Sequence, residues 1–290
     1  MKKHTAFILF VTNLLLILTA CQEHPAKSPL TDAEACIDCH PDSSLMWLQS
    51  LTDDELDKEQ RAYRALLLTH LSHKLECPSL YGDSLINEAV NFYDVENYPK
   101  QRARALFFQG IRRASYEGNE REAVTSLLKA EKIFKQIDDP QYTGMTYERL
   151  GDLFYHERLY KQALKYYQRA LPYKMKASQP KYCVWIVRDI AECFRLTGEQ
   201  DSARANYERA MEQLHLIPER EAASIQTEYA TFLHETGCRE EASLWMKRLP
   251  EALKGIPKDS LFRNDHLQIK ELAETNWLSG GTCITPDSHE

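Results

Sequence analysis

The stretch YERLGDLFYHERLYKQALKYYQRAL, residues 147–171, decides the fold class. Its apolar residues recur at spacings of three and four, which is the period of a helix. Gly151, Ala163 and Ala170 are small, and aromatic side chains stand between them. Small residues let two helices cross closely, while large aromatic rings fill the space beside the crossing. The stretch therefore predicts a pair of packed helices.

The same pattern returns along the chain. IAECFRLTGEQDSARANYERAM at 190–211 and YATFLHETGCREEASLWMKRL at 229–249 repeat its small and aromatic residues, and GIRRASYEGNEREAVTSLLKAEKIF at 110–134 precedes it. The equivalent alanines are separated by 40, 40 and 39 residues: Ala123, Ala163, Ala203 and Ala242. An earlier unit is visible around Ala89. Self-similarity at a fixed period is typical of a solenoid.

These units resemble the tetratricopeptide repeat (TPR), in which Leu-Gly and an aromatic residue on the first helix meet Ala, an aromatic residue and Ala on the second. The resemblance implies an all-α fold, a right-handed superhelix of antiparallel helix pairs over residues 30–250. The period exceeds the usual TPR length of about 34 residues. We expect the extra residues to lengthen the helices and the turns between repeats.

The start of the chain has the layout of a bacterial lipoprotein signal peptide. Lys2 and Lys3 precede an apolar run, and Leu18-Thr19-Ala20-Cys21 resembles a lipobox. The run falls well short of the roughly 20 residues that span a bilayer. We therefore expect a signal peptide at 1–20, acyl chains on Cys21 and a tether at 21–29. The implied location is the cell envelope, with the outer membrane favoured over the inner.

Phrases in the N-terminal third, AEACIDCHPDSSL, QRAYRALLLTH and DSLINEAVNFY, resemble a family of TPR lipoproteins of Bacteroidota. The matching residues are Ala33, Glu34, Pro41, Asp42, Ser43, Leu45, Ala62, Ala65, Leu66, Asp83, Ser84, Leu85, Ile86, Ala89, Val90 and Tyr93. Many relatives continue into a transmembrane helix and a cytoplasmic output domain. This chain carries neither, so direct signalling is not expected of it.

The segment Cys36-x-x-Cys39-His40 has the spacing of a c-type haem attachment site. Zinc is an alternative, with His70, His73 or Cys77 completing the site. The resemblance instead implies that both cysteines pack on one helical face. Pro41 would end that helix, and Asp42 or Ser43 would cap the next. We favour this structural interpretation and predict no metal and no cofactor.

Composition excludes several classes of function. The net charge of −7 offers no general affinity for nucleic acid. Neither a Gly-rich phosphate loop nor a G-x-S-x-G nucleophile turn occurs, and two H-E pairs have no second histidine at the zincin spacing. We therefore predict that the chain is not an enzyme. Trp185 and the tyrosines are expected to pack between repeats.

In the resembled fold the first helix of each pair lines a concave groove that binds peptides. The small residues Gly151, Ala191 and Ala230 serve as reference points for the groove side of each helix. The candidates are Glu148, Asp152, Tyr155, His156, Trp185, Arg188, Glu192, Arg195, Thr227, Thr231 and His234. Arg188 and Arg195 lie seven apart on one face and could hold a carboxylate.

Residues 251–278 are expected to form an amphipathic helix that covers the last repeat, and residues 279–290 a disordered tail. Together these features predict a membrane-tethered TPR lipoprotein that binds an envelope protein or peptide. The alternative is a sensory or accessory component of an envelope signalling system whose output is supplied by a separate membrane protein.

Overall fold

The computed structural model describes residues 29–75, 77, 82–114 and 119–248. These residues form twelve α-helices and two short 3-10 helices and contain no β-strand, which confirms the predicted all-α class. No helix in this part of the chain is long and apolar enough to cross a membrane. The predicted signal peptide, Cys21, the capping helix and the tail lie outside the described residues.

The chain divides into two compact units between Glu96 and Asn97. The described helices of the first unit are α2 (Pro29–Cys36), α3 (Pro41–Ser50), η1 (Asp53–Glu55), α4 (Lys58–Lys74) and α5 (Asp83–Val95). Their core consists of buried aliphatic residues: Leu30, Ala33, Ile37, Leu48, Leu67, Leu68 and Leu71. The hydroxyl of Ser44 donates to the carbonyl of Ala33 at 2.8 Å, which ties α3 to α2.

Two local predictions for the Cys36–His40 segment are wrong. Helix α2 ends at Cys36, so Cys39 lies in the following turn with its side chain exposed instead of packed on a helical face. His40, not Asp42 or Ser43, is the N-cap of α3. The reason is Pro41, which occupies the first helical position, where its missing N–H costs nothing and its fixed φ suits the helix.

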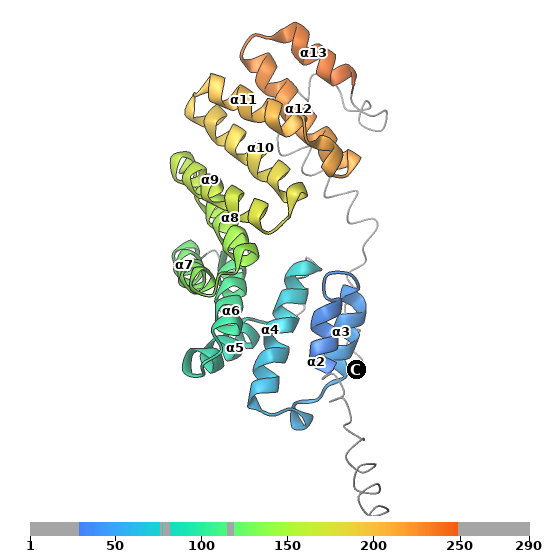
Figure 1. Ribbon diagram of the computed structural model, residues 1–290, viewed down its shortest axis with the longest axis vertical. Coiled ribbons are helices and arrows are strands. Elements are labelled where there is room, and N and C mark those ends of the chain that lie inside the picture. The colour runs from blue at the N-terminus through green and yellow to red at the C-terminus, as the bar shows by residue number, and fades with distance from the viewer. Residues whose placement is uncertain (1–28, 76, 78–81, 115–118, 249–290) are drawn as a thin grey trace, which may run out of the picture. The chain divides into compact units, whose positions relative to one another are not determined.

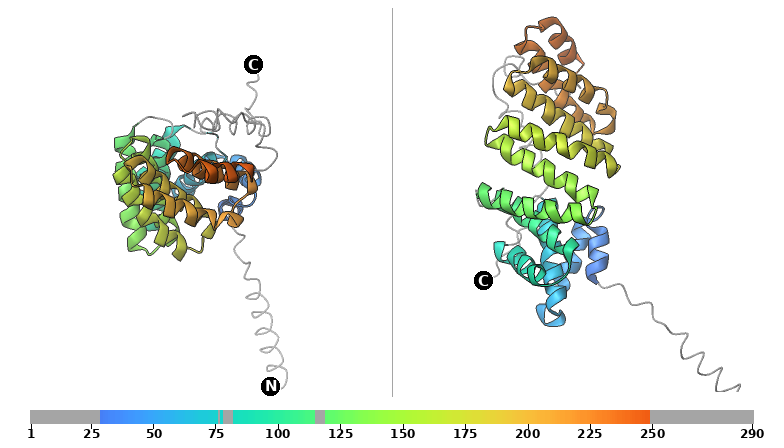
Figure 2. Two further views of the ribbon diagram at one scale, coloured as in Figure 1. Left: turned by 90° about the horizontal axis from the view of Figure 1, so that it is seen from above. Right: turned by 60° about the vertical axis from the view of Figure 1, so that its left-hand side comes forward.

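The second unit is a row of helix pairs. Its elements are α6 (Pro99–Arg112), α7 (Glu120–Gln136), α8 (Pro140–His156), α9 (Tyr160–Lys176), α10 (Pro180–Thr197), α11 (Gln200–Met211), η4 (Leu214–Leu216), α12 (Glu219–Glu235) and α13 (Arg239–Lys247). Consecutive helices pack against each other, and the pairs α6–α7, α8–α9, α10–α11 and α12–α13 follow in chain order (Figures 1 and 2). This arrangement confirms the predicted α-solenoid.

The repeat alanines lie where the helices of a pair cross. Ala123, Ala163 and Ala203 are 0% exposed and Ala242 is 1% exposed. At the α8–α9 crossing, a Cβ atom added to Gly151 would lie 2.6 Å from Cε1 of Tyr167. The prediction that small residues mark the crossings is confirmed.

Long helices account for most of the 40-residue repeat period. Helices α8 and α9 have 17 residues each and α10 has 18, whereas the turns at 157–159 and 177–179 have three. Pro140 and Pro180 occupy first-turn positions, and the Asp139 carboxylate accepts from the backbone N–H of Tyr142 at 3.0 Å. The helices are thus lengthened as predicted. The turn between repeats at 177–179 is short, whereas the connection at 212–218, which contains η4, is longer.

Aromatic rings fill the space between repeats. Tyr207 on α11 stacks on Tyr229 of α12 with ring centroids 5.6 Å apart, and it lies 5.4 Å from the ring of Phe232. All three side chains are buried. Such rings contribute large apolar area together with favourable ring geometry. The expected inter-repeat packing of tyrosines is confirmed here.

Candidate protein-binding surface

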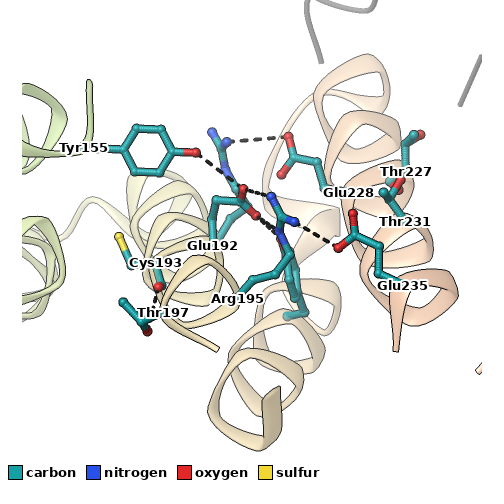
Figure 3. A network of polar contacts seen from close by, with 11 residues as sticks. Tyr155, Glu192, Cys193, Arg195, Thr197, Thr227, Glu228, Thr231 and Glu235 are labelled. Carbon is teal, nitrogen blue, oxygen red and sulfur yellow. Dashed lines mark hydrogen bonds and ion pairs between the residues drawn. The ribbon is translucent and has the colours of Figure 1, made fainter. Parts of the chain in front are cut away.

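The predicted groove residues lie on three first helices, α8, α10 and α12, and the 40-residue period aligns them. Glu148 on α8 corresponds to Arg188 on α10 and to Glu228 on α12. We call the surface on these helices the first-helix face; its charged and hydrogen-bonding residues are Glu148, Asp152, Tyr155, Arg188, Asp189, Glu192, Arg195, Glu228 and Glu235. Figure 3 shows the part of this face that centres on α10.

Glu192 accepts hydrogen bonds from three neighbouring side chains. Arg195 donates to both of its oxygens, at 2.8 Å from Nε and 2.6 Å from the second guanidinium nitrogen. The hydroxyl of Tyr207 on α11 donates at 2.6 Å, and that of Tyr155 on α8 donates at 3.4 Å (Figure 3). The Glu192 side chain is only 10% exposed. This carboxylate therefore joins two repeats and both helices of its own pair.

Arg195 carries the network on to α12. Its remaining terminal nitrogen donates to Oε2 of Glu235 at 2.9 Å, across one repeat period. Arg195 is thus held by two carboxylates of its own chain. Since the Glu235 side chain is 39% exposed, it is the more accessible of the two partners.

Arg188 is held more loosely. Its guanidinium lies 3.3 Å from Oδ1 of Asp189 and 3.5 Å from Oε1 of Glu228, and it sits over the Trp185 ring with 5.4 Å to the centroid. Within the described residues its buried Nε atom forms no hydrogen bond. A guanidinium has five N–H donors in a fixed fork, so Arg188 retains donor capacity that these contacts do not use.

The α8 end of the face repeats this design. Asp152 corresponds to Glu192, and it accepts from the hydroxyl of Tyr167 at 2.9 Å as Glu192 accepts from Tyr207. Arg149 pairs with Asp152 at 3.0 Å. Nearby, Lys174 is 2% exposed and forms an ion pair with Glu148 at 2.7 Å. On α8 and on α10, one carboxylate therefore accepts a hydrogen bond from the tyrosine of the second helix of the same pair.

Asp189 has an unusual protonation equilibrium. Burial, together with the nearby carboxylates of Asp152, Glu148 and Glu228, raises the pKa of its carboxyl to about 7, although Arg188 opposes the shift. The groups that face it come from α8, α9, α10 and α12: Glu148, Asp152, Tyr167, Arg188, Cys193 and Glu228. The surroundings of Asp189 therefore hold more negative charge than the single arginine balances.

Asp189 should make stability depend on pH. Between about pH 4 and pH 7 the folded chain keeps a proton that the unfolded chain has lost, so stability falls as the pH rises through this window. The stability advantage of Asp189→Asn over the parent should therefore grow by about 2–3 kcal/mol between pH 5 and pH 8. Urea unfolding at both pH values measures the difference. Asp54→Asn, at an exposed position on η1, is the matched control. A stability advantage of Asp189→Asn that did not grow with pH would contradict the assignment.

The other predicted residues contribute differently. The hydroxyls of Thr227 and Thr231 donate to backbone carbonyls four residues back, at 2.8 Å each, so neither joins the ion-pair network. Figure 3 places both on the side of α12 away from Arg195. His156 is exposed at the end of α8, with its ring 6.0 Å from that of Tyr155, and His234 is half-buried.

Sequence reasoning missed Asp189, Glu228 and Glu235. A signal was available for two of them, because Glu228 and Glu235 stand one 40-residue period after Arg188 and Arg195. Equivalent positions on neighbouring first helices lie side by side, and opposite charges there can pair. Asp189 has no comparable signal, because the residues one period away, Arg149 and Tyr229, do not indicate a buried carboxylate at this position.

The described histidines and cysteines do not gather into a candidate metal site. In the described part of the chain, no group of three or more His, Cys, Asp or Glu side chains could hold a metal ion. His70 and His73 are half-buried on α4. Burial raises the pKa of Cys193 to about 12, so this thiol stays protonated at neutral pH.

The tetratricopeptide repeat profile matches residues 142–214, which include the pairs α8–α9 and α10–α11. Together with the helix pairs and their crossings, this match shows tetratricopeptide repeats at residues 142–214 within an all-α, TPR-like solenoid fold. No curated protein sequence matches the chain.

Three solved structures illustrate the likeness of fold. A STAND protein with a tetratricopeptide repeat sensor, from Pyrococcus horikoshii, is 18% identical with a TM-score of 0.63; 88% of this chain spans 43% of that one. A Rap protein complexed with competence and sporulation factor is 12% identical with a TM-score of 0.61, covering 93% and 77%. NprR with its cognate peptide NprX is 18% identical with a TM-score of 0.59, covering 88% and 77%.

Proposed function

We propose that this chain is a lipid-anchored scaffold of the bacterial cell envelope that binds a protein or peptide on its first-helix face and has no catalytic activity. The proposal rests mainly on the polar residues of α8, α10 and α12, which are aligned because they recur at the repeat period. Two proteins of similar fold support this choice, a Rap protein complexed with competence and sporulation factor and NprR in complex with its cognate peptide NprX.

The membrane part of the proposal rests on the sequence around Cys21 and on the likeness to TPR lipoproteins of Bacteroidota. Acyl chains on Cys21 would hold residues 30–250 near a membrane, with the outer membrane favoured over the inner. The test is to express the full chain and Cys21→Ala in a bacterium and compare membrane and detergent-phase partitioning. Equal partitioning of both forms would exclude the anchor.

The binding surface is tested by obstruction, because Arg188 and Arg195 support the fold and reversing their charges would disturb it. His156→Trp with Glu235→Trp places two bulky rings at accessible points of the first-helix face. The matched control is Lys165→Trp with Glu212→Trp, at exposed positions on α9 and after α11. We expect cross-linked envelope partners to fall at least about tenfold for the first pair only.

If both double variants recovered the cross-linked partners equally well, the partner would bind elsewhere on the chain.

A second candidate function is a sensory or accessory role, which the likeness to a tetratricopeptide repeat sensor favours. Recovery of a membrane-spanning regulator as the cross-linked partner would select it over the simple scaffold.

A further inference from the structure

Carboxylates outnumber cations on the first-helix face and its immediate neighbours. The six acidic residues are Glu148, Asp152, Asp189, Glu192, Glu228 and Glu235, and the four basic residues that pair with them are Arg149, Lys174, Arg188 and Arg195. Each of the four cations already lies within 3.5 Å of a carboxylate. The face thus carries excess negative charge.

This charge balance bears on the expectation that Arg188 and Arg195 hold a ligand carboxylate. Such a ligand would have to displace Glu235 from Arg195 or Glu228 from Arg188 and would add a further negative charge beside Asp189. Like charges at this range are repulsive, most strongly where water is partly excluded. An acidic segment is therefore a poor fit.

A second observation concerns Arg188. Its ion pairs are long, at 3.3 Å to Asp189 and 3.5 Å to Glu228, and its side chain is 26% exposed, so the terminal N–H groups of its guanidinium can still donate. A neutral acceptor satisfies such a donor without adding charge, and backbone carbonyls of an extended peptide are neutral acceptors. A peptide carbonyl therefore suits Arg188 better than a carboxylate does.

Glu235 offers the complementary contact. Only its Oε2 pairs with Arg195 in the described part of the chain, and its side chain is 39% exposed. Position 195 is seven residues along α10 from position 188, a rise of about 10 Å, which an extended chain covers in about three residues. One segment can thus reach Arg188 with a carbonyl and Glu235 with a lysine or arginine.

We propose that the first-helix face binds an extended segment of a partner protein that carries lysine or arginine, with a backbone carbonyl on Arg188 and the cationic side chain at Glu235. This inference rests on the proposed scaffold function and adds the chemistry of the partner. It makes association sensitive to salt, because the attraction is between partly exposed charges.

The probes are three pools of fluorescent peptides with blocked ends. Peptides of about nine residues suffice, because three neighbouring helices at 8–10 Å spacing cover about 20–30 Å. In each pool the peptides are randomised except at alternate positions. These positions hold Lys or Arg in the cationic pool, Asp or Glu in the acidic pool, and Ser or Gln in the neutral pool. Fluorescence anisotropy with the full-length chain should show the cationic pool binding at least about tenfold more tightly than the acidic pool, with affinity falling as salt is added.

Two charge-matched variants locate the contact. Glu235→Gln should weaken the cationic pool about fivefold, while Glu240→Gln, exposed in the first turn of α13, should not. Arg195 keeps its two bonds to Glu192 in the first variant, so the fold should persist, which thermal melting verifies. If both variants lost affinity for the cationic pool equally, the attraction would depend only on the net charge of the chain, and the inference would be overturned.

Tighter binding of the acidic or neutral pool would also overturn it, while leaving the scaffold function intact. Failure of every pool would refute the peptide chemistry, and the scaffold function would then stand or fall on the obstruction experiment. The two ideas therefore fail on different measurements.

Discussion

Replacing Glu192 with alanine is expected to lower the free energy of unfolding by about 3–5 kcal/mol, the usual cost of removing one partner from a buried charge network. The substitution leaves Arg195 with a single carboxylate, Glu235, and removes the acceptor of the buried Tyr207 hydroxyl. An unpaired buried hydroxyl alone costs about 1–3 kcal/mol. The loss should shift the melting temperature down by about 10 °C.

Chemical denaturation of Glu192→Ala and of Glu212→Ala gives the comparison, since Glu212 is exposed after α11. Glu192→Gln should lie between the parent and Glu192→Ala, because an amide oxygen can still accept from Tyr207 but carries no charge for Arg195. If Glu192→Ala were as stable as the control, the network would contribute nothing to the fold. The pairing would then be a surface feature alone.

The fold of the second unit could be predicted because close helix crossings restrict residue type. A crossing accepts only small side chains, so selection for the fold leaves Ala123, Ala163, Ala203 and Ala242 at a regular period. Few other sequences satisfy that restriction at four successive crossings. The repeat pattern therefore carried most of the architectural information.

The first unit shows where sequence reasoning fails. The segment from Cys36 to His40 could be interpreted as a helix with a packed second cysteine, but the chain leaves the helix at Cys36. The backbone N–H of His40 then bonds to the carbonyl of Cys36 at 2.7 Å in a tight turn. Helix ends fray, and their position varies by about one or two residues, which a periodic pattern does not resolve.

The candidate surface was predictable in part. The position of a residue on its own helix follows from the 3.6-residue period, so Arg188, Glu192 and Arg195 were correctly placed on the first helix of their pair. Whether an arginine on α10 is available to a ligand depends on which residues of α12 face it. In the structure Glu228 and Glu235 of α12 pair with Arg188 and Arg195. This pairing depends on how α10 and α12 pack together, which the sequence of one helix does not determine.

Gly151 is the second position at which a small change should have a large effect. A methyl group there would lie 2.6 Å and 2.7 Å from two carbon atoms of the Tyr167 ring. The ring is 2% exposed, and its hydroxyl is fixed by the bond to Asp152, so it cannot move aside without losing that bond. Gly151→Ala should therefore cost about 2–3 kcal/mol, even though alanine favours a helix by about 1 kcal/mol.

The repeat pattern alone predicts the opposite result, because Ala191 occupies the equivalent position in the next repeat and packs in one cluster with Tyr207. A double-mutant cycle separates the two views. In a Tyr167→Leu background the obstructing ring is gone, so Gly151→Ala should become neutral or stabilising by up to about 1 kcal/mol. The sign change, measured by urea unfolding, would assign the penalty to the Gly151–Tyr167 contact. A penalty that persisted without the ring would instead point to the backbone of α8, and the crossing would not be the reason for glycine at this position.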